Sequence, residues 1–343
     1  MSNLHAERRL KTVRNLAAAT GALAVLLFAF SLIGGQSNGE HPRTGELVFP
    51  DLMEELGTSP TLRIQTADTV YTLQETETGW GLAESGGYPV RADRMRSLAD
   101  ALRTLQWGAV KTRDPSKFDR IGLGDPKLDG AGALIEVLGP NDELIASLIT
   151  GRKSQRVYGR KLSDEALSFQ LEGDLPPLYT RQAWLDLDVL EVPAAVVKSV
   201  RIMRPDGESL LLSREQGGGP RTFRPAPPNQ DDRLLSRLAA AGPALAITRF
   251  FPTDVKPASD LQTEWVARHV TVTHDALEID VHAYQEADGY YITMRAVEAG
   301  NGANRAESIN AKAEGWAFKL SEIDWVDFAP EISSIVRRAS GVP

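Results

Sequence analysis

The N-terminal part of the chain carries one long apolar run. Residues 16–33 (LAAATGALAVLLFAFSLI) contain no charged residue, and basic residues precede them. A helix needs roughly 17–25 such residues to cross a bilayer, and basic residues flank its cytoplasmic end. The pattern predicts a cytoplasmic basic flank at residues 1–14 and a transmembrane signal-anchor helix at residues 15–35. A removed signal peptide and a buried core helix are the alternatives.

Apolar and polar residues alternate after a Gly- and Pro-containing tether at residues 36–60, in which one helical turn is expected at 51–56. Alternation over 61–65 and 70–75 predicts a hairpin, and residues 79–82 a third strand. Met95, Leu98, Leu102 and Leu105 then recur at helical spacing, behind Asp93 as the expected N-cap.

The same order recurs further along the chain. Residues 199–203 and 208–213 predict a hairpin, and a helix is expected from Asp231, with Leu234, Leu235 and Leu238 on one face. Further strand pairs follow each helix, and residues 316–320 and 323–328 close the second set. The expected fold is α+β: the transmembrane helix precedes two tandem, similar units of antiparallel sheet, each covered by a helix. We expect these units at residues 61–193 and 194–330, with a C-terminal tail at 331–343.

Composition narrows the functional classes. The chain has 343 residues, 42% of them apolar, a formal net charge of −8 and no cysteine. The missing cysteines exclude disulfides, thiolate metal sites and a cysteine nucleophile. The acidic balance argues against nucleic acid as a partner.

Two histidines form the one candidate metal pair. If the strands around residues 271 and 279 pair so that the numbers of opposing residues sum to 551, His269 faces His282 directly. Two facing imidazoles could bind zinc or copper, although catalytic zinc sites use three protein ligands. The competing interpretation is a polar, solvent-facing sheet surface.

A basic cluster stands out within the acidic exported region. It consists of Arg152, Lys153, Arg156, Arg160 and Lys161. Such a cluster could contact lipid headgroups, anionic glycans or an acidic partner surface. The competing interpretation is a solvated hairpin face, which charge runs usually are.

Catalytic motifs are lacking in the sequence. There is no G-x-S-x-G nucleophile elbow and no H-E-x-x-H pattern. Carboxylates such as Asp186 and Asp188, or Asp324 and Asp327, would have to face each other across a cleft to act as paired acids, which a sequence does not show. We therefore expect no enzyme, no catalytic residue and no cofactor.

A series of short motifs resembles a known family. It includes Gly79-Trp80-Gly81-Leu82, Pro89-Val90-Arg91-Ala92-Asp93, Phe118-Asp119-Arg120-Ile121-Gly122-Leu123, Thr150-Gly151-Arg152-Lys153 and Trp184-Leu185-Asp186-Leu187. Over residues 61–205, their order and spacing resemble the domain-of-unknown-function family 4340. The resemblance implies a single-pass membrane protein with a periplasmic region, associated with ABC-transporter components similar to the gliding-motility type. It supplies no catalytic or binding residues.

These observations lead to one main expectation and two alternatives. We expect a non-enzymatic, membrane-anchored periplasmic auxiliary subunit of an ABC-type transporter, located at the bacterial inner membrane. Its expected partners are the permease and ATPase subunits, and it would hold a partner or substrate at the outer face of that membrane. The alternatives are an anchored cell-wall or glycan-binding module, and an envelope hydrolase that uses paired acids or a His-bound metal.

Overall fold

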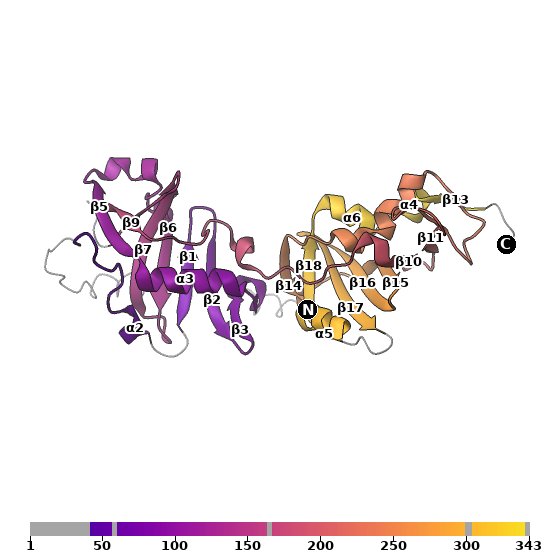
Figure 1. The fold of residues 1–343 in the computed structure, drawn as a ribbon, viewed down its shortest axis with the longest axis horizontal. Helices are drawn as coiled ribbons and strands as arrows, with labels where there is room; N and C mark the ends of the chain where they lie inside the picture. Colours follow the sequence, from indigo (N-terminus) through magenta and orange to yellow (C-terminus); the bar gives the residue numbers. More distant parts are fainter. Residues whose placement is uncertain (1–41, 57–59, 163–166, 299–303, 340–343) are drawn as a thin grey trace, which may run out of the picture. The chain divides into compact units, whose positions relative to one another are not determined.

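Two large antiparallel sheets dominate the fold. The computed structural model describes residues 42–56, 60–162, 167–298 and 304–339, and residues 44–343 pack as one unit. The first sheet has nine strands in the order β4-β3-β2-β1-β6-β7-β8-β9-β5 (Figure 1). Its strands are β1 Thr61–Gln65, β2 Val70–Thr76, β3 Gly79–Leu82, β4 Tyr88–Pro89, β5 Gln106–Thr112, β6 Ala133–Leu138, β7 Leu144–Lys153, β8 Arg156–Arg160 and β9 Ser168–Glu172.

The second sheet has eight strands in the order β12-β11-β10-β15-β16-β17-β18-β14. Its strands are β10 Val197–Met203, β11 Ser209–Arg214, β12 Phe223–Pro225, β14 Asp254–Pro257, β15 Trp265–Thr273, β16 Leu277–Glu286, β17 Gly289–Glu298 and β18 Trp316–Leu320. A separate pair joins β13 Arg233–Leu234 to β19 Val336–Arg337. If β4 is left out, each sheet has eight strands, and the two orders correspond position by position. Strands β3, β2, β1, β6, β7, β8, β9 and β5 of the first sheet then correspond to β12, β11, β10, β15, β16, β17, β18 and β14 of the second.

The central pairing of each sheet links strands that are far apart in the chain. In the first sheet β1 pairs with β6, so that Ile64 lies opposite Ile135. In the second sheet β10 pairs with β15, and Ile202 lies opposite His269 at the corresponding position. The chain between the paired strands contains a helix and an edge strand, which are α3 and β5 in the first sheet and α4 and β14 in the second. This part of the chain must therefore pass over the sheet or around its edge.

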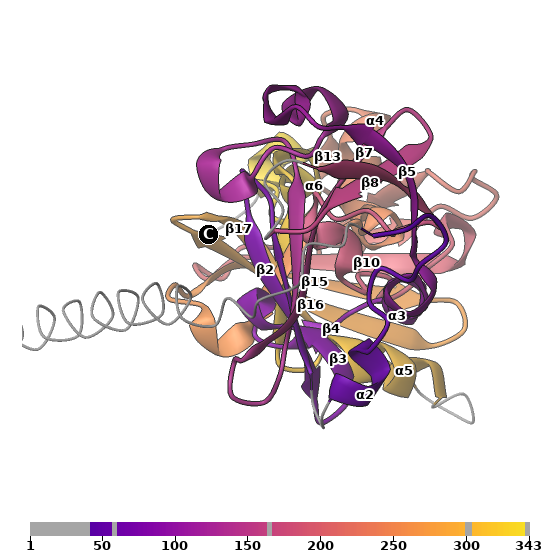
Figure 2. The same ribbon diagram turned by 90° about the vertical axis from the view of Figure 1, so that its left-hand side faces the viewer.

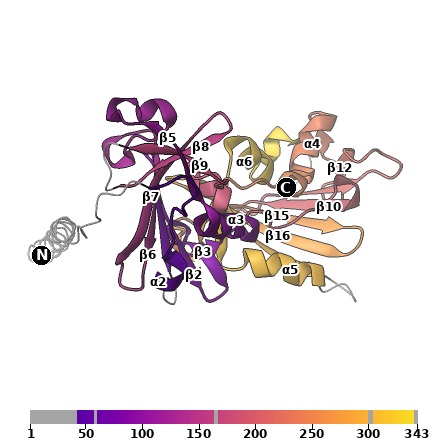
Figure 3. The same cartoon turned by 60° about the vertical axis from the view of Figure 1, so that its left-hand side comes forward.

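Helices are short and lie outside the sheets. They are α2 Leu52–Glu55, α3 Ala92–Thr104, α4 Arg237–Ala244, α5 Asn304–Ala313 and α6 Glu322–Phe328. Helix α3 crosses the first sheet, and its residues Met95, Leu98 and Leu102 are buried in the main core (Figure 1). Helices α4 and α6 lie side by side, and α5 lies apart from them, against β17 (Figures 1 and 3).

The other face of the first sheet is covered without a helix. Along β7, Leu148 belongs to the main core, whereas its neighbour Ile149 belongs to a smaller cluster with Phe118 and Leu123. Successive side chains of a strand point to opposite faces, so residues 115–128 cover the face opposite α3. These residues form three short 3-10 turns near β5 (Figures 1 and 2).

The predicted α+β fold with a membrane-spanning helix was wrong for the part of the chain that the structure describes. The described residues are mostly antiparallel sheet. None of their helices has the length and apolar content needed to cross a membrane. The single-pass, signal-anchor interpretation finds no counterpart there, and the predicted flank 1–14 and helix 15–35 lie outside the described residues.

Two local predictions in the second unit were also wrong. Leu234, expected on a helix, instead pairs with Val336 in the β13–β19 ladder. Helix α4 begins only after Ser236, whose side chain accepts a hydrogen bond from the amide of Ala239. Residues 323–328, expected as a strand, form α6 because Ser321 caps a helix there.

The predicted tether and tail also have packed parts. Residues 44–48 bond to β5: Gly45 N–H donates to the carbonyl of Trp107, and Val48 N–H donates to that of Leu105. Leu52 of α2 is buried. At the other end, Ile335 is buried beside the β13–β19 pair. The Asp93 cap was also misplaced, since α3 begins at Ala92 with no side-chain cap.

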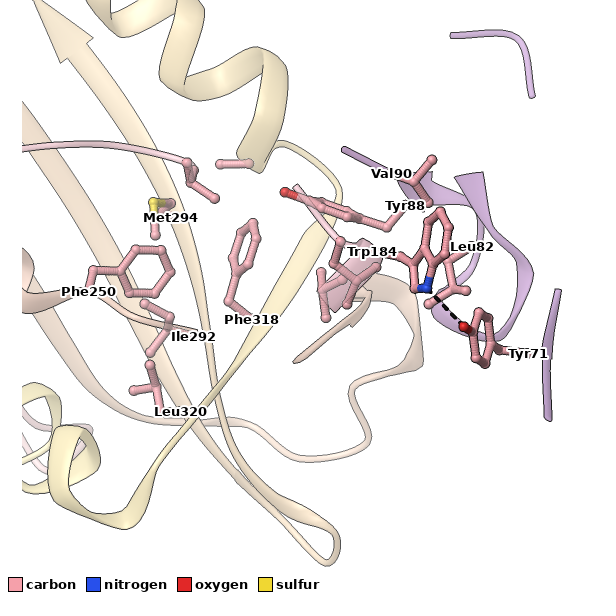
Figure 4. Packing of buried hydrophobic residues seen from close by; sticks show 14 of the residues in the cluster. Tyr71, Leu82, Tyr88, Val90, Trp184, Phe250, Ile292, Met294, Phe318 and Leu320 are labelled. Carbon is pink, nitrogen blue, oxygen red and sulfur yellow. Dashed lines mark hydrogen bonds between the residues drawn. The ribbon is translucent and has the colours of Figure 1, made fainter. Parts of the chain in front are cut away.

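Buried aromatic residues run from the first sheet to the second (Figure 4). Trp184 donates its indole N–H to the Tyr71 hydroxyl at 2.9 Å, and that hydroxyl donates to the carbonyl of Leu178 at 2.7 Å. Burial raises the pKa of Tyr71 above its ordinary value. Tyr88 meets Trp316 edge to face, with ring centroids 4.9 Å apart. The chain after β9 is thereby fixed against β2.

We expect Tyr71→Phe to destabilise the protein by about 1–3 kcal/mol, because the Trp184 N–H and the Leu178 carbonyl would both lose a buried partner. Urea unfolding of the full chain, followed by tryptophan fluorescence, measures the change. Tyr179→Phe is the control, since that hydroxyl makes only a 3.5 Å contact with the Ala131 carbonyl. Equal effects of the two substitutions would contradict this account of the Trp184 anchor.

Candidate functional site

A groove beside α3 is the candidate site, and we call it the α3 groove. It has a volume of about 680 Å³, within the roughly 300–1,000 Å³ usual for ligand pockets. One wall is the helix, through Arg94, Ser97, Asp100, Ala101 and Thr104. The floor comes from β7 and β8, through residues 150–152 and 157, and the far wall is residues 174–179.

Helix α3 presents this wall because of its periodicity. Its apolar residues at helical spacing are buried against the sheet. Arg94, Ser97 and Asp100 follow one another at spacings of three and therefore form a polar stripe beside the buried one. The helix is thus held by its apolar face and exposes the stripe to the groove.

The floor depends on a close approach of two backbone segments. Gly151 of β7 lies against Gly122, and a Cβ added at Gly151 would overlap the carbonyl of Gly122. Only glycine fits this position without displacing the turn at residue 122, which itself has a positive φ. The neighbouring Arg152 then leaves the strand on the α3 side.

Most charges in the α3 groove have partners. Arg152 lies 2.5 Å from a carboxylate oxygen of Asp174 and donates to the carbonyl of Leu175 at 3.0 Å. The hydrogen bond from Arg152 holds the pKa of Asp174 below its ordinary value. Asp100 pairs with Arg103 at 3.1 Å. The charges of Arg152 and Asp174 therefore neutralise each other, and so do those of Arg103 and Asp100.

Arg94 is the exception among these charges. Its Nε atom is buried and has no hydrogen-bond partner within the described part of the chain. No ion pair joins its guanidinium to a described carboxylate. A buried N–H without an acceptor costs roughly 1–3 kcal/mol, and more on a charged group. The α3 groove therefore carries one uncompensated positive charge.

The hydroxyl groups of the groove are engaged with the backbone. Ser97 donates to the carbonyl of Asp93, Thr104 to that of Asp100, and Thr150 to that of Tyr158. Burial raises the pKa of Tyr179. A serine or threonine nucleophile needs an adjacent base, and these hydroxyls donate to carbonyls instead.

The structure distributes the predicted basic cluster over several environments. Arg152 lines the α3 groove, and Lys153 donates to the carbonyl of Arg120 at 2.8 Å. Arg156 is exposed opposite Lys153, at the end of the β7–β8 hairpin. Arg160 is buried, donates to the carbonyl of Leu123 and lies over the ring of Phe118, while Lys161 is exposed. Arg160 thus supports the fold. Arg94, which also lines the α3 groove, was not among the candidate residues predicted from the sequence.

The predicted facing histidine pair was wrong. His269 lies opposite Val281, and His282 lies opposite Arg268. The hairpin loop has three residues and ends with Ala276 in the left-handed region, so opposing numbers sum to 550. A slip of one residue moves a side chain to the other face of the sheet. His269 and His282 consequently point to opposite faces.

Neither histidine belongs to a cluster of metal ligands. His269 is fully buried, with its Nε2 atom 2.7 Å from the carbonyl oxygen of Pro243. His282 lies near the ring of Trp265. Within the described residues, no group of three or more histidine, aspartate or glutamate side chains could hold a metal ion.

Three of the four carboxylates in the predicted acid pairs are bound to other side chains. Asp186 pairs with Lys312 at 3.1 Å. Asp324 accepts from Ser321, and Asp327 pairs with Arg249 at 2.5 Å. Burial raises the pKa of Asp327. These carboxylates hold elements together in the structure.

Fold and groove define a class: a protein of two like-ordered antiparallel sheets with a groove beside helix α3 of the first. The chain belongs to the family described as domain of unknown function (DUF4340), whose model matches residues 80–263. The matched region includes every residue that lines the α3 groove. No curated protein and no solved structure matches the chain.

The buried histidine makes stability depend on pH. Burial lowers the pKa of His269 from 6.5 to about 4, so between these values the unfolded chain binds a proton that the folded chain does not. This contribution to stability is complete above pH 6.5, is lost as the pH falls towards 4, and amounts to at most about 3 kcal/mol.

His269→Ile, which copies Ile135 at the corresponding position of the first sheet, should flatten the pH dependence of the free energy of unfolding between pH 6.5 and 4. Urea titrations at a series of pH values measure the slope. His274→Gln, at an exposed position, is the control. A slope unchanged in His269→Ile would show that His269 is not the group responsible.

Proposed function

We propose that this protein is a non-enzymatic binding subunit that holds a partner in the α3 groove. The single observation that carries the proposal is the buried, unpartnered Nε of Arg94 in a groove whose other described charges are paired. The Arg94 guanidinium also makes no ion pair with a described carboxylate, and a ligand that brings an acidic group can pair with its charge.

The chemistry of the groove favours binding over reaction. Its Ser and Thr hydroxyls donate to backbone carbonyls. Arg152 is held in place by Asp174 and Leu175. A guanidinium fixed in this way recognises a planar acceptor with little loss of side-chain freedom.

The wider setting of the proposal rests on the family resemblance. We propose that the partner belongs to an ABC-type transporter assembly, and that the protein acts on the periplasmic side of the bacterial inner membrane. The subunit would then bring a partner or substrate to the transporter by raising its local concentration there.

Charge reversal in the groove should disrupt this assembly. In Arg94→Glu and in Arg152→Glu, we expect recovery of permease and ATPase subunits to fall at least about tenfold, since a like charge would face the ligand. Affinity purification of the full chain from a detergent extract of the native cells, with quantitative mass spectrometry, measures it.

Arg96→Glu is the matched control, because it makes the same charge change on an exposed residue of α3 that does not line the groove. Recovery of the transporter subunits with all three variants would refute the groove as the docking site. Recovery of cell-wall fragments in place of a permease from the unaltered chain would refute the transporter assignment.

A further inference from the structure

We infer that the ligand of the α3 groove is an acidic peptide segment, which places a carboxylate against Arg94. This inference rests on the proposal that the groove is the binding site, and it adds the chemistry of the occupant. In the second unit, the chain itself supplies a segment at the corresponding place.

The like order of the two sheets defines which segments correspond. Strand β9 of the first sheet corresponds to β18 of the second, and α3 corresponds to α4. The segment after β9, beginning at residue 173, therefore corresponds to the segment after β18, which forms α6.

In the second unit, α6 packs directly on α4. A Cβ added at Gly242 of α4 would overlap the carboxylate of Asp327, so that the two helices are in contact at this point. Asp327 also pairs with Arg249, which follows α4, at 2.5 Å. Phe328 is fully buried beside His269. An acidic and apolar segment thus covers the helix, and its carboxylate neutralises an arginine.

In the first unit, the corresponding segment forms no α-helix, and its first helical turn is a 3-10 turn at Arg181–Trp184. Pro176 and Pro177 lack backbone N–H groups, which disfavours a helix interior there, and residues 174–179 instead form the far wall of the groove. The space beside α3 stays open, and Arg94 has no counterpart to the carboxylate that Asp327 supplies to Arg249.

The carboxylate is not available from the groove itself. Asp174 is held by Arg152, and Asp100 by Arg103. The open volume of about 680 Å³ is lined by both polar and apolar groups, among them Ala101, Val157 and Leu175. A peptide that combines a carboxylate with apolar side chains matches this lining, as α6 (EIDWVDF) does against α4.

The experiment is a selection of phage-displayed random dodecapeptides on the immobilised full chain. We expect the enriched peptides to contain more Asp and Glu than the starting library. Synthetic copies should bind at least about tenfold more weakly to Arg94→Gln than to the unaltered chain, because a charge-assisted hydrogen bond is lost. Arg96→Gln should bind them as the unaltered chain does.

A peptide-side control does not depend on how the variants fold. Replacing the acids of an enriched peptide with Asn or Gln should reproduce the loss of binding to the unaltered chain. The inference fails if no peptide is enriched, if the enriched peptides show no acidic bias, or if they bind Arg94→Gln and the unaltered chain equally.

These outcomes are separable from those of the proposed function. Capture of a transporter that depends on Arg94, together with peptides lacking an acidic bias, would keep the groove as docking site and refute the acidic ligand. Acidic, Arg94-dependent peptides without recovery of transporter subunits would keep the ligand chemistry and refute the transporter assignment.

Discussion

Pairing between the first strand of each unit and a strand much later in the chain is the constraint on which the rest depends. The β1–β6 and β10–β15 ladders join an N-terminal hairpin to a later meander. The intervening helix and edge strand must then be accommodated outside the central ladder. Helix α3 buries its apolar residues against the core, and α4 does so through Ala240 and Ala244, while its Leu238 is exposed. The space beside each helix is a consequence of this arrangement.

The two units differ in what lies beside the helix that covers the sheet. After β18, Ser321 caps helix α6, whose Asp327 contacts α4 at Gly242 and whose Phe328 is buried. After β9, two prolines and the Trp184–Tyr71 anchor lead the chain along the far wall and leave the α3 groove open. The second unit thus places a helix of its own chain against α4, whereas the corresponding space beside α3 in the first unit stays open.

Local signals were sufficient to predict some of the hairpins, and long-range pairing was not visible in the sequence. Residues 61–65 and 70–75 were expected to pair because alternation and a short turn specify a hairpin locally, and they do pair. Leu234 was misassigned because its partner, Val336, lies about a hundred residues away. The register between β15 and β16, which carry His269 and His282, was predicted wrongly. The loop between these strands has three residues and ends with Ala276 in the left-handed region, which the sequence pattern did not indicate. Of the groove, only Arg152 was identified, since Arg94 lies in a polar stripe that resembles an ordinary solvated helix face.

The most direct test of the central claim, that the α3 groove is the working surface, is hydrogen–deuterium exchange of the full chain, free and within the assembly captured from native cells. The account predicts slower exchange in the assembly for residues 92–104 and 173–179, with little change in α4 and α6. Slower exchange confined to the second sheet, with these two segments unchanged, would contradict it.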